Sequence, residues 1–139
     1  MAYDDDNIFA KILRGEIPAH KILENDQALA FLDVMPQAKG HALVIPKTPS
    51  KNLLDADPAG FGPVLTMVQQ VAQAAMRAFQ ADGIMIQQFN NAAAGQTVFH
   101  THFHVIPRFE GVVLQAHSGQ MADNEVLAKL AEMYRAALS

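Results

Sequence analysis

The hydrophobic residues of the chain follow two periodicities, which predict a mixture of helices and strands. Between Asp57 and Gly83, apolar residues recur every three or four positions, the spacing of one face of an α-helix. Asp57-Pro58 is a typical start for such a helix, and Gly83 suits its end. We expect its inward face to carry Phe61, Leu65, Val68, Val71, Ala72, Ala75 and Phe79.

Two shorter helices are expected near the ends of the chain. Asn7 is a typical helix cap, and the apolar residues after it continue to Leu13, with a stop near Gly15. Asp123 likewise suits the cap of a final helix. The inward face of that helix is expected to carry Val126, Leu127, Leu130, Met133, Tyr134 and Leu138. Residues 1–6 are rich in aspartate and predict a flexible acidic tail.

Five short segments have the alternation or the β-branched and aromatic content of strands. They are residues 20–24, 28–32, 41–45, 84–90 and 98–108. Their spacing is typical of hairpins and not of βαβ units, so we expect an antiparallel sheet in an α+β fold. No internal repeat or linker divides the chain, and residues 7–139 are expected to form one domain.

The last predicted strand carries three histidines at alternate positions, His100, His102 and His104. Side chains alternate along a strand, so these imidazoles would share one face. Three interpretations follow: incidental histidines on a half-buried strand, a metal site, or covalent catalysis by the central imidazole. At a rise of ~3.3 Å per residue, His100 and His104 lie ~13 Å apart, too far for one ion to bind all three easily.

A stretch of small and polar residues precedes the histidines. It reads Asn90-Asn91-Ala92-Ala93-Ala94-Gly95-Gln96-Thr97 and predicts a loop that presents backbone N–H groups and a hydroxyl close to them. Such a loop is suited to hold a phosphate group.

Composition narrows the classes of partner. The net charge of −4 and the pI near 5.8 give no basic surface, so a nucleic-acid polymer is not an expected partner. The chain has no cysteines, which excludes disulfides and thiolate metal sites. No apolar run approaches ~18 residues, and the acidic start is unlike a secretory signal. We therefore expect no membrane association and a cytoplasmic protein.

The segment from Gly95 to Ile106 resembles the signature of the histidine triad (HIT) family, His-φ-His-φ-His-φ-φ with φ apolar. The Gly95-Gln96-Thr97 lead-in is part of the match, whereas Thr101 departs from it because only its methyl group is apolar. Residues 31–47 resemble the other hallmark segment of the family. With residues 8–18, the likeness covers roughly residues 7–110 and is nearest the Hint-like branch and its bacterial relatives.

The resemblance implies a HIT-like fold, with a five-stranded antiparallel sheet, one long helix and shorter N- and C-terminal helices. It also implies a homodimer that cleaves purine nucleotide derivatives at the α-phosphate. In this scheme His102 forms a covalent nucleotidyl-histidine intermediate, while His100 and His104 stabilise the charge around it. Phosphoramidates, adenylates and dinucleoside polyphosphates are all candidate substrates, and no metal or other cofactor is required.

The resemblance also assigns roles to residues that would otherwise be ordinary. Asp33, by itself a turn residue, would bind the ribose hydroxyls, and His41 would support the active site. The phosphate donors would be Asn90, Gly95, Gln96 and Thr97, with Asn91 as an alternative to Asn90. The nucleobase pocket would be walled by Phe9, Ile12, Phe31 and Val34, which the sequence alone predicts as core.

Two alternatives to this function remain open. One is a metal-dependent hydrolase that uses the His-x-His pair, and the other is a nucleotide-binding partner protein with weak catalysis. Some bacterial relatives hold a structural zinc with two cysteines of the first helix, but Asn7 and Ala10 stand at those positions, so we expect no such site. Residues 109–121 stay unassigned, with His117 expected at the surface.

Overall fold

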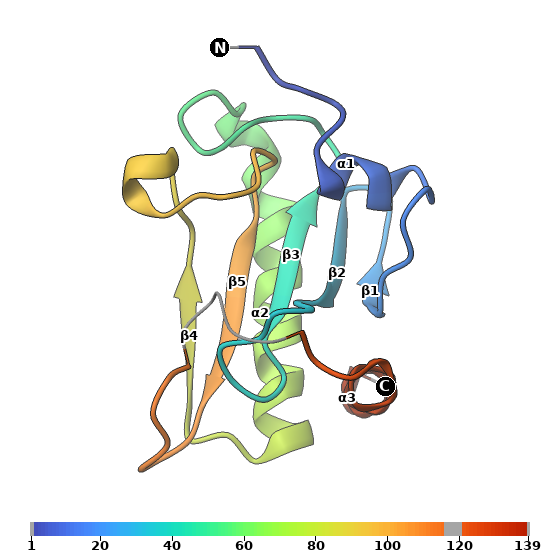
Figure 1. Cartoon of the computed structure of the whole chain (residues 1–139), viewed down its shortest axis with the longest axis vertical. Helices are drawn as coiled ribbons and strands as arrows, with labels where there is room; N and C mark the ends of the chain where they lie inside the picture. Colours follow the sequence, from blue (N-terminus) through green and yellow to red (C-terminus); the bar gives the residue numbers. More distant parts are fainter. Residues whose placement is uncertain (1, 116–120, 139) are drawn as a thin grey trace.

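A five-stranded antiparallel sheet with the strand order β1-β2-β3-β5-β4 forms the centre of the computed structural model, which describes residues 2–115 and 121–138 (Figure 1). His117 therefore lies outside the described residues. The strands are β1 (Lys21–Glu24), β2 (Ala28–Leu32), β3 (Ala42–Pro46), β4 (Gly83–Gln87) and β5 (Phe103–Arg108). The helices are α1 (Ile8–Leu13), α2 (Phe61–Phe79) and α3 (Asn124–Leu138), with 3-10 turns η1 (Pro58–Gly60) and η2 (Ala92–Ala94). The predicted α+β fold with an antiparallel sheet is confirmed.

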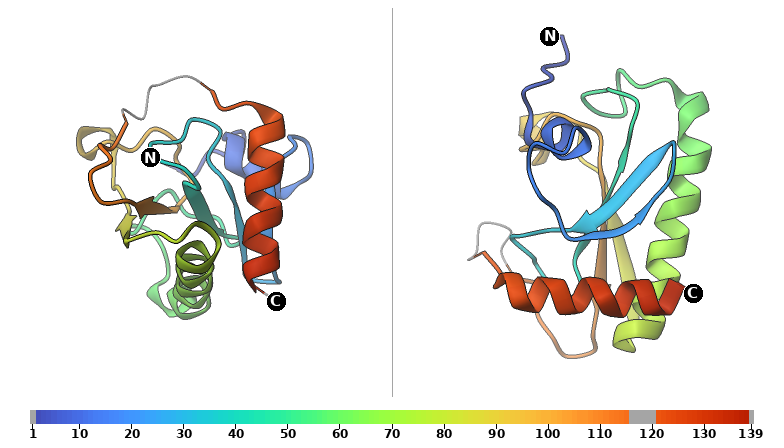
Figure 2. Two further views of the ribbon diagram at one scale, coloured as in Figure 1. Left: turned by 90° about the horizontal axis from the view of Figure 1, so that it is seen from below. Right: turned by 90° about the vertical axis from the view of Figure 1, so that its right-hand side faces the viewer.

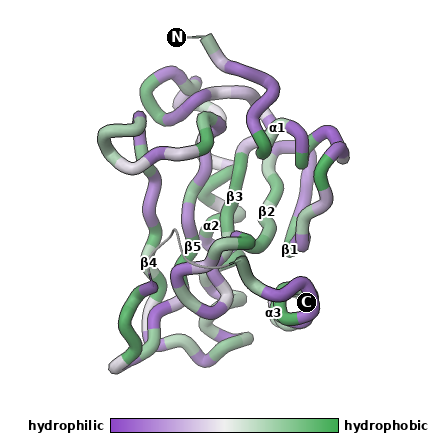
Figure 3. Tube along the Cα trace, viewed as in Figure 1, coloured by the Kyte–Doolittle hydropathy of each residue, from purple (hydrophilic) through white to green (hydrophobic). Residues whose placement is uncertain are grey.

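The two faces of the sheet are covered by different helices (Figure 2). Along β2, Ala28, Ala30 and Leu32 pack toward α2 and α3, whereas Leu29 and Phe31 pack toward α1. This alternation is the period of two that a strand imposes on its side chains. Because β2 and β3 are buried on both faces, they read as continuous apolar runs, which Figure 3 shows as hydrophobic stretches.

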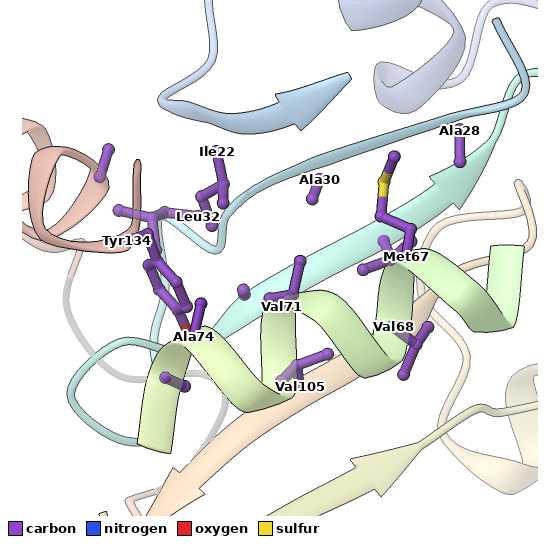
Figure 4. Packing of buried hydrophobic residues seen from close by; sticks show 14 of the residues in the cluster. Ile22, Ala28, Ala30, Leu32, Met67, Val68, Val71, Ala74, Val105 and Tyr134 are labelled. Atoms are coloured by element: carbon purple, nitrogen blue, oxygen red, sulfur yellow. The ribbon is translucent and has the colours of Figure 1, made fainter. Parts of the chain in front are cut away.

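The long helix α2 differs from its sequence prediction at two points. Leu65 is 49% exposed, and the buried face instead includes Val64 and Met67, so the predicted stripe was wrong by one position at its start. The helix ends at Phe79, because Gln80 adopts the left-handed conformation, and Gly83 opens β4 and does not end the helix. Figure 4 shows the inner face of α2 against the sheet.

The caps of the two shorter helices are confirmed. The Asn7 side chain accepts a hydrogen bond from the Ala10 backbone at 2.9 Å, and Asp123 accepts one from the Glu125 backbone at 2.8 Å. In α3, Val126 was wrongly predicted to face inward, since it is 52% exposed.

Within the described ranges, no helix has the length and apolar character to cross a membrane.

The last strand is shorter than predicted. The sequence favoured residues 98–108, but β5 begins at Phe103. Residue Thr101 explains the difference, because its backbone N–H donates to the Ser50 carbonyl at 2.9 Å and its hydroxyl bonds the Ser50 hydroxyl at 2.6 Å. These bonds draw the chain toward the loop after β3, so His100 and His102 lie outside the strand.

A buried tyrosine links α3 to the turn that precedes β3. The Tyr134 hydroxyl donates to the Gly40 carbonyl at 2.5 Å, and its ring meets the Phe79 ring edge-on with centroids 5.0 Å apart. Burial raises the pKa of Tyr134, so the hydroxyl keeps the proton it donates. Gly40 has a φ of +82°, and a Cβ there would lie 2.6 Å from the Phe79 ring. Position 40 therefore requires glycine. The turn at Gly40 in turn fixes the backbone of the next residue, His41.

Replacing this glycine tests how far the turn supports the fold. In Gly40→Ala, a left-handed φ costs about 1–2 kcal/mol and overpacking against Phe79 about 1–3 kcal/mol. We expect a clear drop in the free energy of unfolding, measured by urea denaturation. Gly62→Ala is the matched control, because it lies in α2 with open space around its Cβ position and an alanine there favours the helix. Equal stability of the two variants would contradict the role of Gly40.

Candidate active site

A pocket of about 660 Å³ lies between α1, the ends of β2 and β5, and the start of α3. This volume falls in the range of small-molecule sites. Its lining is mostly apolar, and its polar members are His20, Asp33, Thr97, His102, His104 and Asn124. Of the residues predicted from the sequence, the pocket brings together Phe9, Ile12, Phe31, Asp33, Val34, Thr97, His102 and His104.

The orientation of His102 is set by the main chain. Its Nδ1 lies 2.6 Å from the carbonyl oxygen of His100. A carbonyl only accepts, so Nδ1 carries the proton and Nε2 of the neutral ring carries the lone pair. The ring is 6% exposed, lines the pocket and meets the Phe9 ring edge-on at 4.9 Å between centroids. His102 therefore presents a nucleophilic nitrogen on the side of the ring opposite the main chain.

His104 is oriented by a second chain of hydrogen bonds. The Gln37 backbone N–H donates to His41 Nδ1 at 3.0 Å, so the proton of His41 is on Nε2. His41 Nε2 lies 2.9 Å from His104 Nδ1 and donates to it, which leaves the proton of His104 on its own Nε2. His104 thus carries an N–H donor, and its ring lies 5.1 Å from that of His102.

Asp33 stands at the junction of this chain with the pocket. Its Oδ1 accepts from the Met35 backbone at 2.8 Å, and its Oδ2 lies 3.5 Å from His41 Nε2. The carboxylate is 6% exposed and lines the pocket. Its position allows it to receive hydroxyl hydrogens from a ligand.

His100 lies in a different environment from His102 and His104. It is fully buried and does not line the pocket. Its Nε2 donates to the Pro46 carbonyl at 2.8 Å, and its Nδ1 accepts from the Tyr3 hydroxyl at 2.6 Å. The Tyr3 hydroxyl in turn accepts from the Asn7 amide at 2.9 Å. Sequence reasoning missed this contact, because Tyr3 lies in the predicted tail and is 97 residues away from His100.

Burial lowers the pKa of His100, the charge of a protonated His102 lowers it further, and the bond to Pro46 opposes both effects. His100 thus stays neutral in the folded protein, and its carbonyl, not its ring, reaches His102.

The loop before the histidines is held together by Gln96. Its amide donates to the carbonyls of Lys51 at 2.7 Å and Val98 at 2.9 Å, and its oxygen accepts from the Asn91 backbone at 2.8 Å. Gln96 was predicted to bind phosphate, but both N–H groups of its side chain are hydrogen-bonded within the protein.

Of the other predicted donors, only Thr97 lines the pocket. Asn90 accepts from the Leu53 backbone at 2.9 Å, and Asn91 accepts from the Asn52 amide at 3.0 Å. Gly95, with a φ of +105°, turns the chain into Gln96. Asn90, Gly95 and Gln96 therefore shape the loop that carries Thr97, and their contact with phosphate stays a prediction.

In the part of the chain that the structure describes, one cluster has the composition of a metal site. Ligand atoms of Asp33, His41 and His104 lie within 4.8 Å of one another, and all three residues are buried. A histidine binds a metal through a lone pair, but His41 Nε2 carries a proton because its Nδ1 accepts from Gln37. The donor set in this arrangement does not fit an ion. At the two zinc positions of some relatives, Asn7 caps α1 and Ala10 has no ligand atom.

A family model described as HIT domain matches residues 14–111. This chain belongs to the HIT family. It is 47% identical to an uncharacterized HIT-like protein of Borreliella burgdorferi over 76% of this chain and 77% of that one. It is 40% identical to the adenylylsulfatase HINT3 of Arabidopsis thaliana over 76% of this chain and 54% of the plant protein.

Among solved structures, a HIT-like protein of Bartonella henselae involved in cell-cycle regulation superposes with a TM-score of 0.92. The two are 53% identical, and the match covers 98% of this chain and 99% of that one. The resemblance to the HIT family, inferred from His100, His102 and His104, is confirmed. The predicted HIT-like fold is confirmed as well.

The neutral state of His100 predicts a pH dependence of stability. The unfolded chain takes up a proton at His100 near the ordinary pKa of 6.5, whereas the folded chain does so only at lower pH. The unfolded state then binds more protons, so the free energy of unfolding falls as the pH drops below 6.5 and is constant above that window. Urea denaturation at several pH values from 8 to 5 measures this free energy of unfolding. His100→Asn is expected to flatten this slope, and an unchanged slope in the variant would contradict the assignment.

Proposed function

We propose that this HIT protein hydrolyses purine nucleotide derivatives at the α-phosphate through a covalent nucleotidyl-histidine at His102 Nε2. The bond from His102 Nδ1 to the His100 carbonyl is the observation that carries the proposal. It fixes the tautomer whose Nε2 lone pair attacks phosphorus, and the ring lines a pocket of nucleotide size.

In the first step, Nε2 attacks the α-phosphorus, a P–N bond forms and the bond to the leaving group breaks. The leaving group departs with the electron pair and takes a proton from solvent, and we assign to His104 Nε2–H a hydrogen bond to the charge that develops there. The alkylated ring of His102 is then cationic, and its Nδ1–H bond to the His100 carbonyl is strengthened. Water next attacks phosphorus and loses a proton to solvent, the P–N bond breaks, its electrons return to Nε2, and a nucleoside monophosphate is released.

The remaining lining supports the nucleotide part of the proposal. Phe9, Ile12, Phe31 and Val34 offer apolar walls for a base, Asp33 an acceptor for ribose hydroxyls, and the Thr97 hydroxyl a donor for phosphate. Phosphoramidates, adenylates and dinucleoside polyphosphates all present the same α-phosphorus. That the Arabidopsis relative is an adenylylsulfatase supports an adenylyl substrate.

We also propose that the protein is a cytoplasmic homodimer. The strand β4 forms one edge of the sheet, and Ile86 on it is 44% exposed. An exposed edge of this kind favours pairing with a second copy.

Removal of the nucleophile is the direct test of the covalent mechanism. In His102→Ala, hydrolysis of adenosine 5′-phosphoramidate is expected to fall on the order of 10⁴–10⁶-fold, the scale of losing a nucleophile. Quenching turnover of a radiolabelled substrate with alkaline detergent should preserve an adduct on wild-type His102, which later acid treatment releases, and should yield none on the variant. Calorimetry with AMP is the control that the pocket persists. Unchanged hydrolysis in the variant would contradict the covalent mechanism, and retained AMP binding would then support the nucleotide-binding partner protein.

The metal-dependent alternative makes the opposite prediction for a chelator. Because Nε2 of His104 carries a proton and His100 does not line the pocket, His102 is the one member of the His-x-His-x-His segment with a lone pair at the pocket, and we expect exhaustive EDTA treatment to leave the hydrolysis rate unchanged. The rate is followed before treatment, after dialysis and after addition of Zn²⁺. A loss of activity that zinc restores would favour the alternative.

A further inference from the structure

One wall of the pocket is built by a part of the chain that the family model does not match. The match ends at residue 111, yet Met121 and Asn124, at the start of α3, line the pocket. His20 lines it from the segment before β1, and its Nε2 lies 3.2 Å from Asn124 Oδ1. The hydrogen bond of this pair joins two segments of the pocket wall that are more than 100 residues apart in sequence.

Both members of this pair are held in place by their backbones. The His20 carbonyl accepts from the Leu32 backbone at 3.1 Å, next to Asp33. On the other side, the Ala122 backbone donates to the Val34 carbonyl at 2.9 Å. Farther along α3, Arg135 donates to the Lys21 carbonyl at 2.7 Å. The start of α3 is thus fixed relative to β1 and β2, and the pair lies beside the carboxylate proposed to hold the ribose.

The chemistry of the pair differs from that of its surroundings. The nearby lining, Ile17, Pro18, Val34 and Met121, is apolar. Hydrogen bonds to a base on this side of the pocket therefore fall to His20 and Asn124. Because His20 Nε2–H donates to Asn124 Oδ1, the protein engages the amide oxygen, and the two N–H donors of the NH₂ group are the part of the amide that we expect a ligand to meet.

We propose that His20 and Asn124 form a base-reading pair that selects purines with acceptors on their outer edge. The proposal rests on the nucleotide site proposed above and names its base preference. Guanine presents two acceptors, N7 and O6, whereas adenine presents one acceptor, N7, beside the N6 donor. An amide that offers N–H donors matches the guanine edge at both positions and the adenine edge at one.

The test is the ratio of AMP to GMP dissociation constants, measured by calorimetry on the whole protein without turnover. The wild type should bind GMP about 5- to 10-fold more tightly than AMP, the scale of one hydrogen bond. Asn124→Asp replaces the donor with an acceptor and should invert the ratio in favour of AMP. His20→Ala releases the amide from its fixed orientation, and the ratio should approach one.

The substitution at Asn124 is suited to this test because an aspartate in the first turn of α3 favours the helix. Lys129→Gln is the matched control, since it makes the same change of one unit in charge on the exposed surface of α3 and does not line the pocket. It should weaken both nucleotides alike and leave their ratio unchanged. A ratio in Asn124→Asp within twofold of the wild type, or the same shift in Lys129→Gln, would overturn the base-reading pair.

The two proposals fail in different ways. A labelled His102 adduct together with an unaltered ratio in Asn124→Asp would remove the base-reading pair and keep the covalent mechanism. An inverted AMP-to-GMP ratio in Asn124→Asp, with no labelled adduct on His102, would remove the covalent mechanism and keep the base-reading pair.

Discussion

The hydrogen bond between His102 Nδ1 and the His100 carbonyl is the constraint on which the site depends. A carbonyl in a strand normally bonds to its neighbouring strand, so this one is available to a side chain only because β5 begins later, at Phe103. The bonds from Thr101 to Ser50 draw the chain out of the sheet. The ring of His100, held between Tyr3 and Pro46, then keeps the carbonyl in place.

The same principle decides the roles of the other histidines. The backbone N–H of Gln37 donates to His41 Nδ1, so the proton of His41 lies on Nε2 and is donated to His104 Nδ1, which leaves the proton of His104 on its own Nε2. Main-chain groups have fixed polarity, so these bonds assign a lone pair to His102 Nε2 and an N–H to His104 Nε2. The proposed nucleophile and the proposed hydrogen-bond donor thus both line the pocket, with their ring centroids 5.1 Å apart.

Local signals in the sequence predicted what local interactions determine. The cap at Asn7, the limits of β2 and the start of the α2 region at Asp57 each depend on a few adjacent residues. The late start of β5 and the contact of Tyr3 with His100 depend on residues 51 and 97 positions apart, for which no pattern in one sequence gives a signal. Gln96 was identified from its motif, but its bonds to the loop became visible only in three dimensions.

In the proposed function, the reaction and the choice of base depend on different parts of the chain. The proposed reacting groups, His102 and His104, are oriented through the His100 carbonyl before β5 and the Gln37 N–H before β3. The wall proposed to meet the base comes from α1, the segment before β1 and the first turn of α3. Because Arg135 and Ala122 tie α3 to β1 and to the residue after Asp33, a change at Asn124 alters the pocket surface and leaves the His102 bond intact. If the proposed roles hold, substitutions in α3 change the ligand of such a site while the groups that act on phosphorus keep their orientation.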